Sequence, residues 1–85
     1  MLKITLTAGD TTATLFLEGR MVGPWVTEVR KSCENFLQSG KELRLNLAGV
    51  SFIDSNGLAL LSHFRARGVA LLDCSPFVEE QLKGL

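Results

Sequence analysis

Two hydrophobic periods alternate along this chain of 85 residues, and their alternation restricts the fold more than any other feature. Residues 2–7 and 13–18 place apolar side chains at every second position, which is typical of a strand with one buried face. Between residues 22 and 37, apolar side chains recur at steps of three and four, which predicts one face of a helix. A chain that switches between these periods is expected to build a sheet covered by helices.

Turn and cap residues divide the first half of the chain. The segment "AGDT" separates the two alternating runs and predicts a hairpin that Gly19 closes. Gly23 and Pro24 are expected to open the first helix, because proline at the first helical position loses no N–H that the helix needs. Ser39 and Gly40 form a stop signal for this helix. The residues expected to face inward from the first strand are Leu2, Ile4 and Leu6.

The second half repeats the pattern of strand and helix. Alternation over residues 43–47 predicts a third strand, and the polar residues 54–57 are expected to begin a helix that Gly68 ends. Residues 69–72 form a continuous apolar run, which predicts a strand covered on both faces. Ser75 and Pro76 predict the start of a last helix. The inward-facing residues of that helix are expected to be Val78, Leu82 and Leu85.

The predicted order is therefore β-β-α-β-α-β-α, in a single small α/β domain over residues 1–85 with three helices and a four-stranded sheet. Short strand–helix–strand units predict parallel neighbours, and the opening hairpin adds an antiparallel pair, so the sheet is expected to be mixed. Hydrophobic residues make up 46% of the chain and charged residues 21%, which is enough apolar material for a core.

Charge and composition exclude several classes of function. Nine basic residues balance nine acidic ones, so the chain lacks the basic surface that nucleic acid or an anionic membrane would require. No apolar stretch approaches ~18 residues, and the first residues lack the apolar core of a signal peptide, so we expect a cytoplasmic protein without direct membrane insertion. Cys33 and Cys74 fit no metal spacing and are expected to be reduced, buried thiols.

Residues 54–57, Asp-Ser-Asn-Gly, form a polar corner between a buried strand and a buried helix. In open α/β folds, function concentrates at the carboxyl ends of strands, beside helix N-termini whose free N–H groups favour negative charge. A purely structural interpretation is also available: Asp54 caps the helix, and Gly57 allows close packing. Under that interpretation, Ser55 and Asn56 are only polar residues of the first turn.

The sequence supports no catalytic site. His63 is the only histidine, and it lies eight residues after Ser55 on the same predicted helix, about 12 Å away at ~1.5 Å per residue. A nucleophile and its base must be within hydrogen-bond reach, so this pair is excluded. No glycine-rich phosphate loop and no second histidine for a metal are present. We therefore predict no catalytic residue, no metal and no cofactor.

The segments "LRLNLAGVSFIDSNGLALL" and "RGVALLDCSPFVEEQLKGL" resemble the central motif and the closing strand–helix unit of STAS domains, the family named for sulfate transporters and anti-sigma factor antagonists. The resemblance covers nearly the whole chain and implies a protein-interaction switch without catalysis. In the family's anti-sigma factor antagonists, a serine kinase that is also the anti-sigma factor phosphorylates the hydroxyl residue directly before the glycine. That position is Asn56 here, so the candidate for phosphorylation is Ser55, one residue earlier.

The resemblance leaves alternative functions open. One is an anti-sigma factor antagonist that binds a kinase-like ATPase; another is an accessory subunit of an ABC-type phospholipid transport system that binds its cytoplasmic ATPase. Members of the second group often keep Ser or Thr at the first of the two positions, and they tolerate a residue without a hydroxyl at the second. A third possibility is a fold kept for oligomerisation alone. In each of the first two cases, the expected partner-binding residues are Ser51, Asp54, Ser55, Asn56, Gly57, Ser62, His63 and Arg67.

Overall fold

The structure, a computed structural model, describes residues 2–83 and contains four strands and three helices. In chain order they are β1 (Leu2–Ala8), β2 (Thr12–Met21), α1 (Pro24–Gln38), β3 (Glu42–Ile53), α2 (Ser55–Ala66), β4 (Ala70–Leu72) and α3 (Pro76–Lys83). This order confirms the predicted small α/β fold. Within the described residues, no helix is both long enough and apolar enough to cross a membrane.

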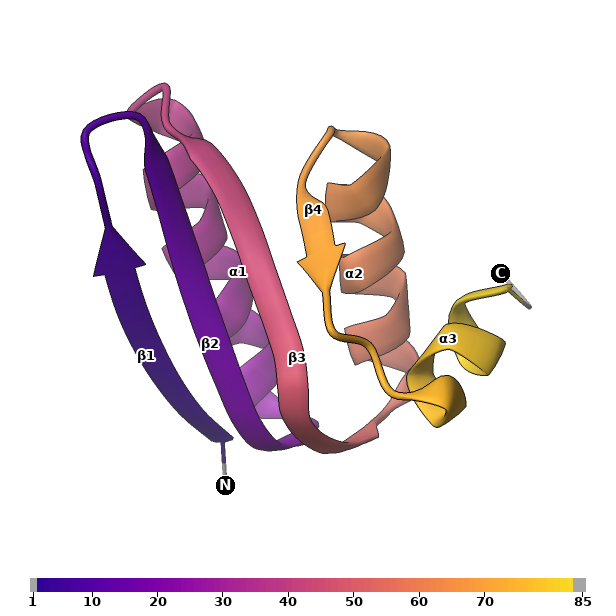
Figure 1. The fold of residues 1–85 in the computed structure, drawn as a ribbon. Helices are drawn as coiled ribbons and strands as arrows, with labels where there is room; N and C mark the ends of the chain where they lie inside the picture. The colour runs from indigo at the N-terminus through magenta and orange to yellow at the C-terminus, as the bar shows by residue number, and fades with distance from the viewer. Residues whose placement is uncertain (1, 84–85) are drawn as a thin grey trace.

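The strands form one mixed sheet in the order β1-β2-β3-β4 (Figure 1). β1 and β2 pair antiparallel as a hairpin, whereas β2 pairs parallel with β3, and β3 with β4. Each parallel pair is connected by a helix, α1 in the first case and α2 in the second, as such crossovers require. The prediction of a mixed four-stranded sheet is confirmed.

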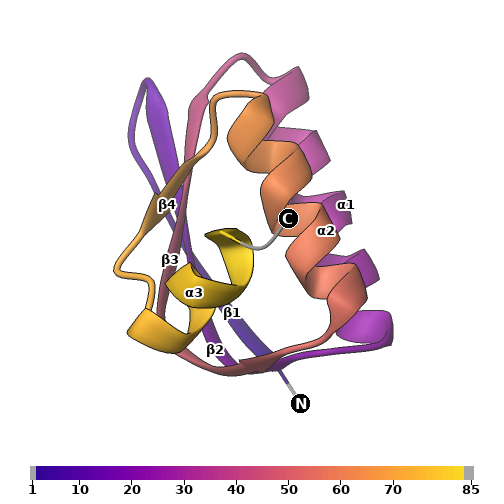
Figure 2. The same cartoon turned by 90° about the vertical axis from the view of Figure 1, so that its right-hand side faces the viewer.

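Helices α1 and α2 lie side by side over one face of the sheet (Figure 2). Helix α3 lies near the carboxyl end of β4 and contacts α2. The core between these layers is wholly apolar, because no polar or charged side chain among residues 2–83 is buried. Its fully buried members include Leu15, Leu17, Leu45 and Leu47 from the strands and Val29, Leu61 and Phe64 from the helices.

The helix ends follow the predicted cap residues. Pro24 is the first residue of α1, and Ser39 is its C-cap. The Ser75 hydroxyl oxygen accepts a hydrogen bond from the Val78 N–H at 3.3 Å and so caps α3. Val78 is buried, as is the next inward position one turn later, whereas Leu85 lies outside the described residues.

Two strands are longer than the sequence predicted. β2 continues through Gly19 to Met21, and β3 continues through Gly49 to Ile53. Register shifts along β2 keep the two strands paired to their ends. A Cβ on Gly49 would lie only 2.7 Å from Glu18 Cγ, so this glycine allows the two strands to approach closely instead of ending one of them.

Two burial predictions are wrong, both at sheet edges. The Leu6 side chain is 45% exposed, because β1 is an edge strand and α1 lies behind its neighbours (Figure 1). β4 is only half-buried, because it is the other edge strand and α1 and α2 cover a single face (Figure 2). The hydrophobic pattern of a strand does not reveal its position in the sheet.

Both cysteines are free thiols. Cys33 is buried on the inner side of α1, where burial and the neighbouring Glu34 carboxylate raise the pKa of its thiol to about 12. Cys74 is only half-buried, which differs from the prediction that both thiols are buried, and it follows the edge strand β4. Burial also raises the pKa of its thiol. Both side chains are therefore protonated at neutral pH and unreactive as nucleophiles.

Candidate functional site

The polar corner, residues 54–57, lies where two parallel strands end and two helices begin. β2 and β3 end at Met21 and Ile53, and α1 and α2 begin directly beyond them. The Asp54 N–H donates to the Met21 carbonyl at 3.2 Å, which joins the two strand ends. The corner is thus at the carboxyl edge of the sheet, where α/β folds place their functional sites.

The Asp54 carboxylate caps both helices. Oδ1 accepts the Gly57 N–H at 2.8 Å, in the first turn of α2. Oδ2 accepts the N–H of Gly23, the N-cap residue of α1, at 3.0 Å. Gly23 has a φ of 55°, which favours glycine, and it has no side chain with which to cap α1. The predicted cap on α2 is confirmed, and the same carboxylate also holds the start of α1.

These donors stabilise the charged form of the carboxylate. Hydrogen bonds from the N–H of Gly23, and then from those of Gly57 and Asn56, hold the pKa of Asp54 below its ordinary value. Because the folded-state pKa is the lower one, ionised Asp54 stabilises the fold above the unfolded-state pKa. This stabilisation is lost as the pH falls through the folded-state pKa.

Asp54→Asn is expected to destabilise the protein more at neutral than at acid pH. The amide keeps one acceptor but turns a donor toward the second N–H, so one of the two caps becomes a donor–donor contact. Acid protonates the wild-type carboxylate, so the difference between the two proteins should shrink below about pH 4. Urea unfolding at about pH 7 and about pH 3 measures this difference, with Asp10→Asn in the exposed β1–β2 turn as the control. A difference that stays constant across this range would contradict the role of the charge.

The other three residues of the corner differ in exposure. Ser55 and Asn56 are exposed at the start of α2, whereas Gly57 is buried. A Cβ on Gly57 would lie 2.7 Å from Ile53 Cγ2 and 3.0 Å from the Met21 carbonyl oxygen. The first turn of α2 therefore lies directly against the ends of β2 and β3, and only glycine fits there.

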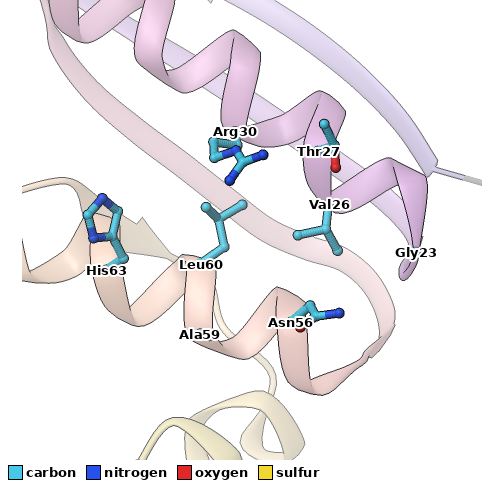
Figure 3. Close-up of a pocket in the computed structure, with 8 residues that line it drawn as sticks. All are labelled: Gly23, Val26, Thr27, Arg30, Asn56, Ala59, Leu60 and His63. Carbon is cyan, nitrogen blue, oxygen red and sulfur yellow. The ribbon is translucent and has the colours of Figure 1, made fainter.

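A groove of about 450 Å³ lies between the N-terminal halves of α1 and α2 (Figure 3). Val26 and Leu60 point toward one another between the helices, with polar side chains on either side (Figure 3). Thr27 and Arg30 line it from α1, and Asn56 and His63 line it from α2. Asn56 thus belongs both to the corner and to the groove.

The predicted partner-binding residues fall into two groups. Asn56 of the corner and His63 line the groove, and both are exposed. The other three corner residues adjoin Asn56 in the chain and do not line the groove. Arg67 lies near the other end of α2, where it forms an ion pair with Glu34 of α1. Its guanidinium also lies 5.7 Å from the centre of the Phe64 ring. The Arg67 side chain therefore links α2 to α1, and part of its bonding capacity is used within the protein.

Two predicted serines lie apart from the groove. Ser51 is exposed in β3, where its hydroxyl donates to the Gly19 carbonyl at 3.2 Å. Ser62 is half-buried on α2 and does not line the groove. Of the predicted partner-binding residues, the structure thus brings Asn56 and His63 to one groove, and it does not bring these two serines or Arg67 there.

The contribution of α1 was missed by reasoning from the sequence. Thr27 and Arg30 are three residues apart, a spacing that places them on one side of a helix. Which element faces that side depends on the packing of α1 against α2, and no local pattern carries that information. The spacing was the only signal present.

The groove is suited to binding a polar partner surface. Arg30 supplies a positive charge, and no carboxylate is among the side chains that line the groove. Asn56 and Thr27 add hydrogen-bonding groups above an apolar floor. Among residues 2–83, no three His, Cys, Asp or Glu side chains are close enough to hold a metal ion. The charge of the groove is complementary to an acidic side chain.

Several solved structures are similar to this chain. The anti-sigma factor antagonist SpoIIAA in its unphosphorylated form matches with a TM-score of 0.75 and 23% identity, over 95% of this chain and 82% of that one. An uncharacterized Shewanella loihica protein of the DUF3478 family, with a SpoIIAA-like fold, matches with a TM-score of 0.60 and 7% identity, over 89% and 69%. A protein named Mglu matches with a TM-score of 0.65 and 22% identity, over 85% of this chain but 19% of its own. No family model and no curated protein matches the sequence.

These similarities establish the fold. The four strands and three helices have the arrangement found in SpoIIAA, which confirms the resemblance to STAS domains at the level of the fold. The low sequence identities do not extend the likeness to particular partners or modifications. Function must therefore be argued from the corner and the groove.

Proposed function

We propose that this chain is a non-enzymatic regulator of the anti-sigma factor antagonist type, acting in the cytoplasm. The observation that carries the proposal is the exposed pair Ser55 and Asn56, displayed at the start of α2 on the fold that SpoIIAA also has. The proposed partner is a kinase-like ATPase that serves as an anti-sigma factor. It would bind the corner and the adjoining groove.

The fixed geometry of the corner supports a role in docking. Asp54 holds the starts of α1 and α2 with two hydrogen bonds, and Gly57 packs against the strand ends. Ser55 and Asn56 are therefore carried on a backbone that is already ordered before a partner arrives. A preformed surface loses less conformational entropy on binding than a flexible one.

The groove supplies the second part of the proposed contact surface. Asn56 offers an amide, and Arg30 offers a guanidinium on the facing helix. An acidic side chain of the partner would pair with Arg30, and such complementarity fixes orientation and raises the association rate. Because Arg67 is already paired with Glu34, we assign Arg67, with Ser51 and Ser62, to the rim of this surface.

Ser55 is the proposed site of phosphorylation. It is exposed in the first turn of α2, where the helix dipole favours a phosphate, although the Asp54 carboxylate next to it opposes one. The acceptor position implied by the resemblance is Asn56, which has no hydroxyl. A kinase acting here would have to accept a hydroxyl displaced by about 100° around the helix.

Ser55→Asp is expected to weaken partner binding roughly tenfold, or ~1.4 kcal/mol, because it adds a second negative charge beside Asp54 where the partner docks. Isothermal titration against the purified partner measures the change. Thr11→Asp is the matched control, because it adds the same charge at an exposed turn at the opposite end of β2. Equal affinities for wild type and Ser55→Asp would contradict a contact at this position.

A pull-down from the native cell extract, with the purified domain as bait and mass spectrometry of the retained proteins, tests the function. Recovery of a kinase-like ATPase, lost with Ser55→Asp and kept with Thr11→Asp, would support the proposal. Incubation of that ATPase with the domain and ATP should then place one phosphate on Ser55, and none on Ser55→Ala. Recovery of no ATPase by the wild type would contradict the proposal.

A second candidate function is favoured by Asn56. A residue without a hydroxyl directly before Gly57 suits the accessory STAS subunits of ABC-type phospholipid transport systems, which often keep Ser or Thr one position earlier, as at Ser55. The partner would then be the cytoplasmic ATPase of the transporter, with Ser55 as a contact residue. Recovery of an ABC ATPase or its permease in the same pull-down, without phosphate on Ser55, would select this function.

A further inference from the structure

Among residues 2–83, no strand pairs with the outer edge of β1. β1 is the terminal strand of the sheet, and it pairs with β2 in continuous register from Leu2 opposite Gly19 to Ala8 opposite Ala13. The strand contains no proline and no bulge, and Lys3 is its only charged residue. Proline, bulges and charged side chains are the devices by which proteins usually prevent an edge strand from pairing with another chain. Of these devices, β1 has only the single charge of Lys3.

The other edge of the sheet is protected. β4 has three residues, which is too short to offer a long pairing surface. It is followed by Asp73, whose φ of 54° turns the chain away and whose carboxylate accepts a hydrogen bond from Asn46 at 2.9 Å. An edge-to-edge contact is therefore expected at β1 and not at β4.

The side of β1 that faces the helix layer carries both a projection and a hollow. Leu6 projects there, with 45% of its side chain exposed. Two and four residues earlier, Ile4 and Leu2 line a hollow of about 390 Å³ whose other wall is the start of α1, including Trp25. α1 does not extend over β1 (Figure 1), and the residues that line the hollow come only from β1 and the start of α1.

We propose that β1 pairs antiparallel with β1 of a second copy of this chain, about a two-fold axis at Thr5. In this register, Leu6 of each copy lies opposite Ile4 of the other, so each projection lies beside the other copy's hollow. Lys3 lies opposite Thr7, and the two Thr5 side chains lie opposite one another, so no like charges are directly opposed. The arrangement is reciprocal, as a two-fold interface requires. The proposal does not depend on the proposed function.

Other registers fit less well. A shift by one residue is not available, because the N–H and C=O groups that point to the outer edge belong to alternate residues of β1 and would no longer face one another. A two-fold axis at Ile4 would use only residues 2–6 and leave the end of each strand unpaired. The register about Thr5 is the one that pairs all seven residues of β1.

The size of the contact predicts a weak dimer. Seven paired residues span about 24 Å at ~3.4 Å per residue. Because α1 does not extend over β1, the contact is about one sheet layer thick, ~10 Å. The contact is therefore on the order of 250 Å² per copy, well below the ~800 Å² of a standard interface. We therefore expect association in the high-micromolar range, with no permanent dimer at lower concentrations.

Sedimentation equilibrium over tens of micromolar to about 1 mM tests the proposal. The average mass of the wild type should rise toward twice that of the monomer across this range. Leu6→Lys should remain monomeric throughout, because it removes the projection and sets two charges at the contact. Phe77→Lys is the matched control, because Phe77 is an equally exposed apolar residue, at 50%, on α3, and this variant should associate like the wild type.

A cysteine cross-link tests the register. In a Cys74→Ser background, Thr5→Cys should form a disulfide-linked dimer under mild oxidation faster than Thr7→Cys, because only residue 5 faces its own copy. A wild type that stays monomeric, or a dimer that survives Leu6→Lys, would overturn the proposal. If the wild type stays monomeric but Leu6→Lys blocks capture of another protein, the occupant of the edge is a strand of that protein and not a second copy.

Discussion

Gly57→Ala should lower the free energy of unfolding by about 1–3 kcal/mol, and Gly57→Val by more, because the added atoms overpack a closed site. A Cβ would lie 3.0 Å from the Met21 carbonyl oxygen, which belongs to the backbone and cannot rotate away. The better helix propensity of alanine, worth ~1 kcal/mol over glycine, opposes the loss without removing it. The branched valine adds crowding in the first turn of α2. Urea unfolding monitored by circular dichroism measures the effect.

Gly9→Ala is the matched control for this experiment. Gly9 lies in the exposed β1–β2 turn, where the nearest atom to an added Cβ is the Thr12 hydroxyl oxygen, at 3.8 Å. The control variant should therefore unfold at nearly the same urea concentration as the wild type. If Gly57→Ala proved as stable as the wild type, α2 would not lie as closely against the strand ends as described here.

Arg30→Glu is expected to reduce partner binding by tenfold or more, or ~1.4 kcal/mol. Arg30 is the only lysine, arginine or carboxylate residue that lines the groove, so this change reverses the charge offered to the partner. Titration of the partner at two salt concentrations measures the change, and added salt should reduce the difference from the wild type. The matched control is Lys31→Glu, which makes the same change of charge on the next residue of α1. Lys31 is exposed and does not line the groove. Equal losses in the two variants would show that net charge, and not the groove, controls binding.

The order of the elements could be predicted from the sequence because each depends on local signals. Hydrophobic periods distinguish strands from helices, and caps such as Pro24 and Ser75 mark where helices begin. Strand ends depend on a neighbour instead. Gly49 looks like a break within its own segment, yet β3 continues past it because β2 remains paired alongside. Exposure at Leu6 likewise depends on where α1 lies and not on the pattern of β1.

The candidate site also has one part that local sequence predicts and another part that depends on packing. The corner is one continuous segment, so its polar residues and the cap by Asp54 were visible in the sequence. The groove is formed by two helices that pack together, and the share of it supplied by Arg30 became apparent only in three dimensions. The ion pair between Arg67, a predicted partner-binding residue, and Glu34 of the facing helix likewise became apparent only in three dimensions.

The Asp54 carboxylate also has a consequence for how the molecule opens. Its bond to Gly23 closes a loop across 31 positions of the chain, which contains the whole of α1 and β3. If both hydrogen bonds of the carboxylate break, the starts of α1 and α2 lose a cap at the same time. Hydrogen exchange of the Gly23 and Gly57 amide protons should therefore report the same free energy of local opening. The two helix starts, distant in sequence, then behave as one cooperative unit.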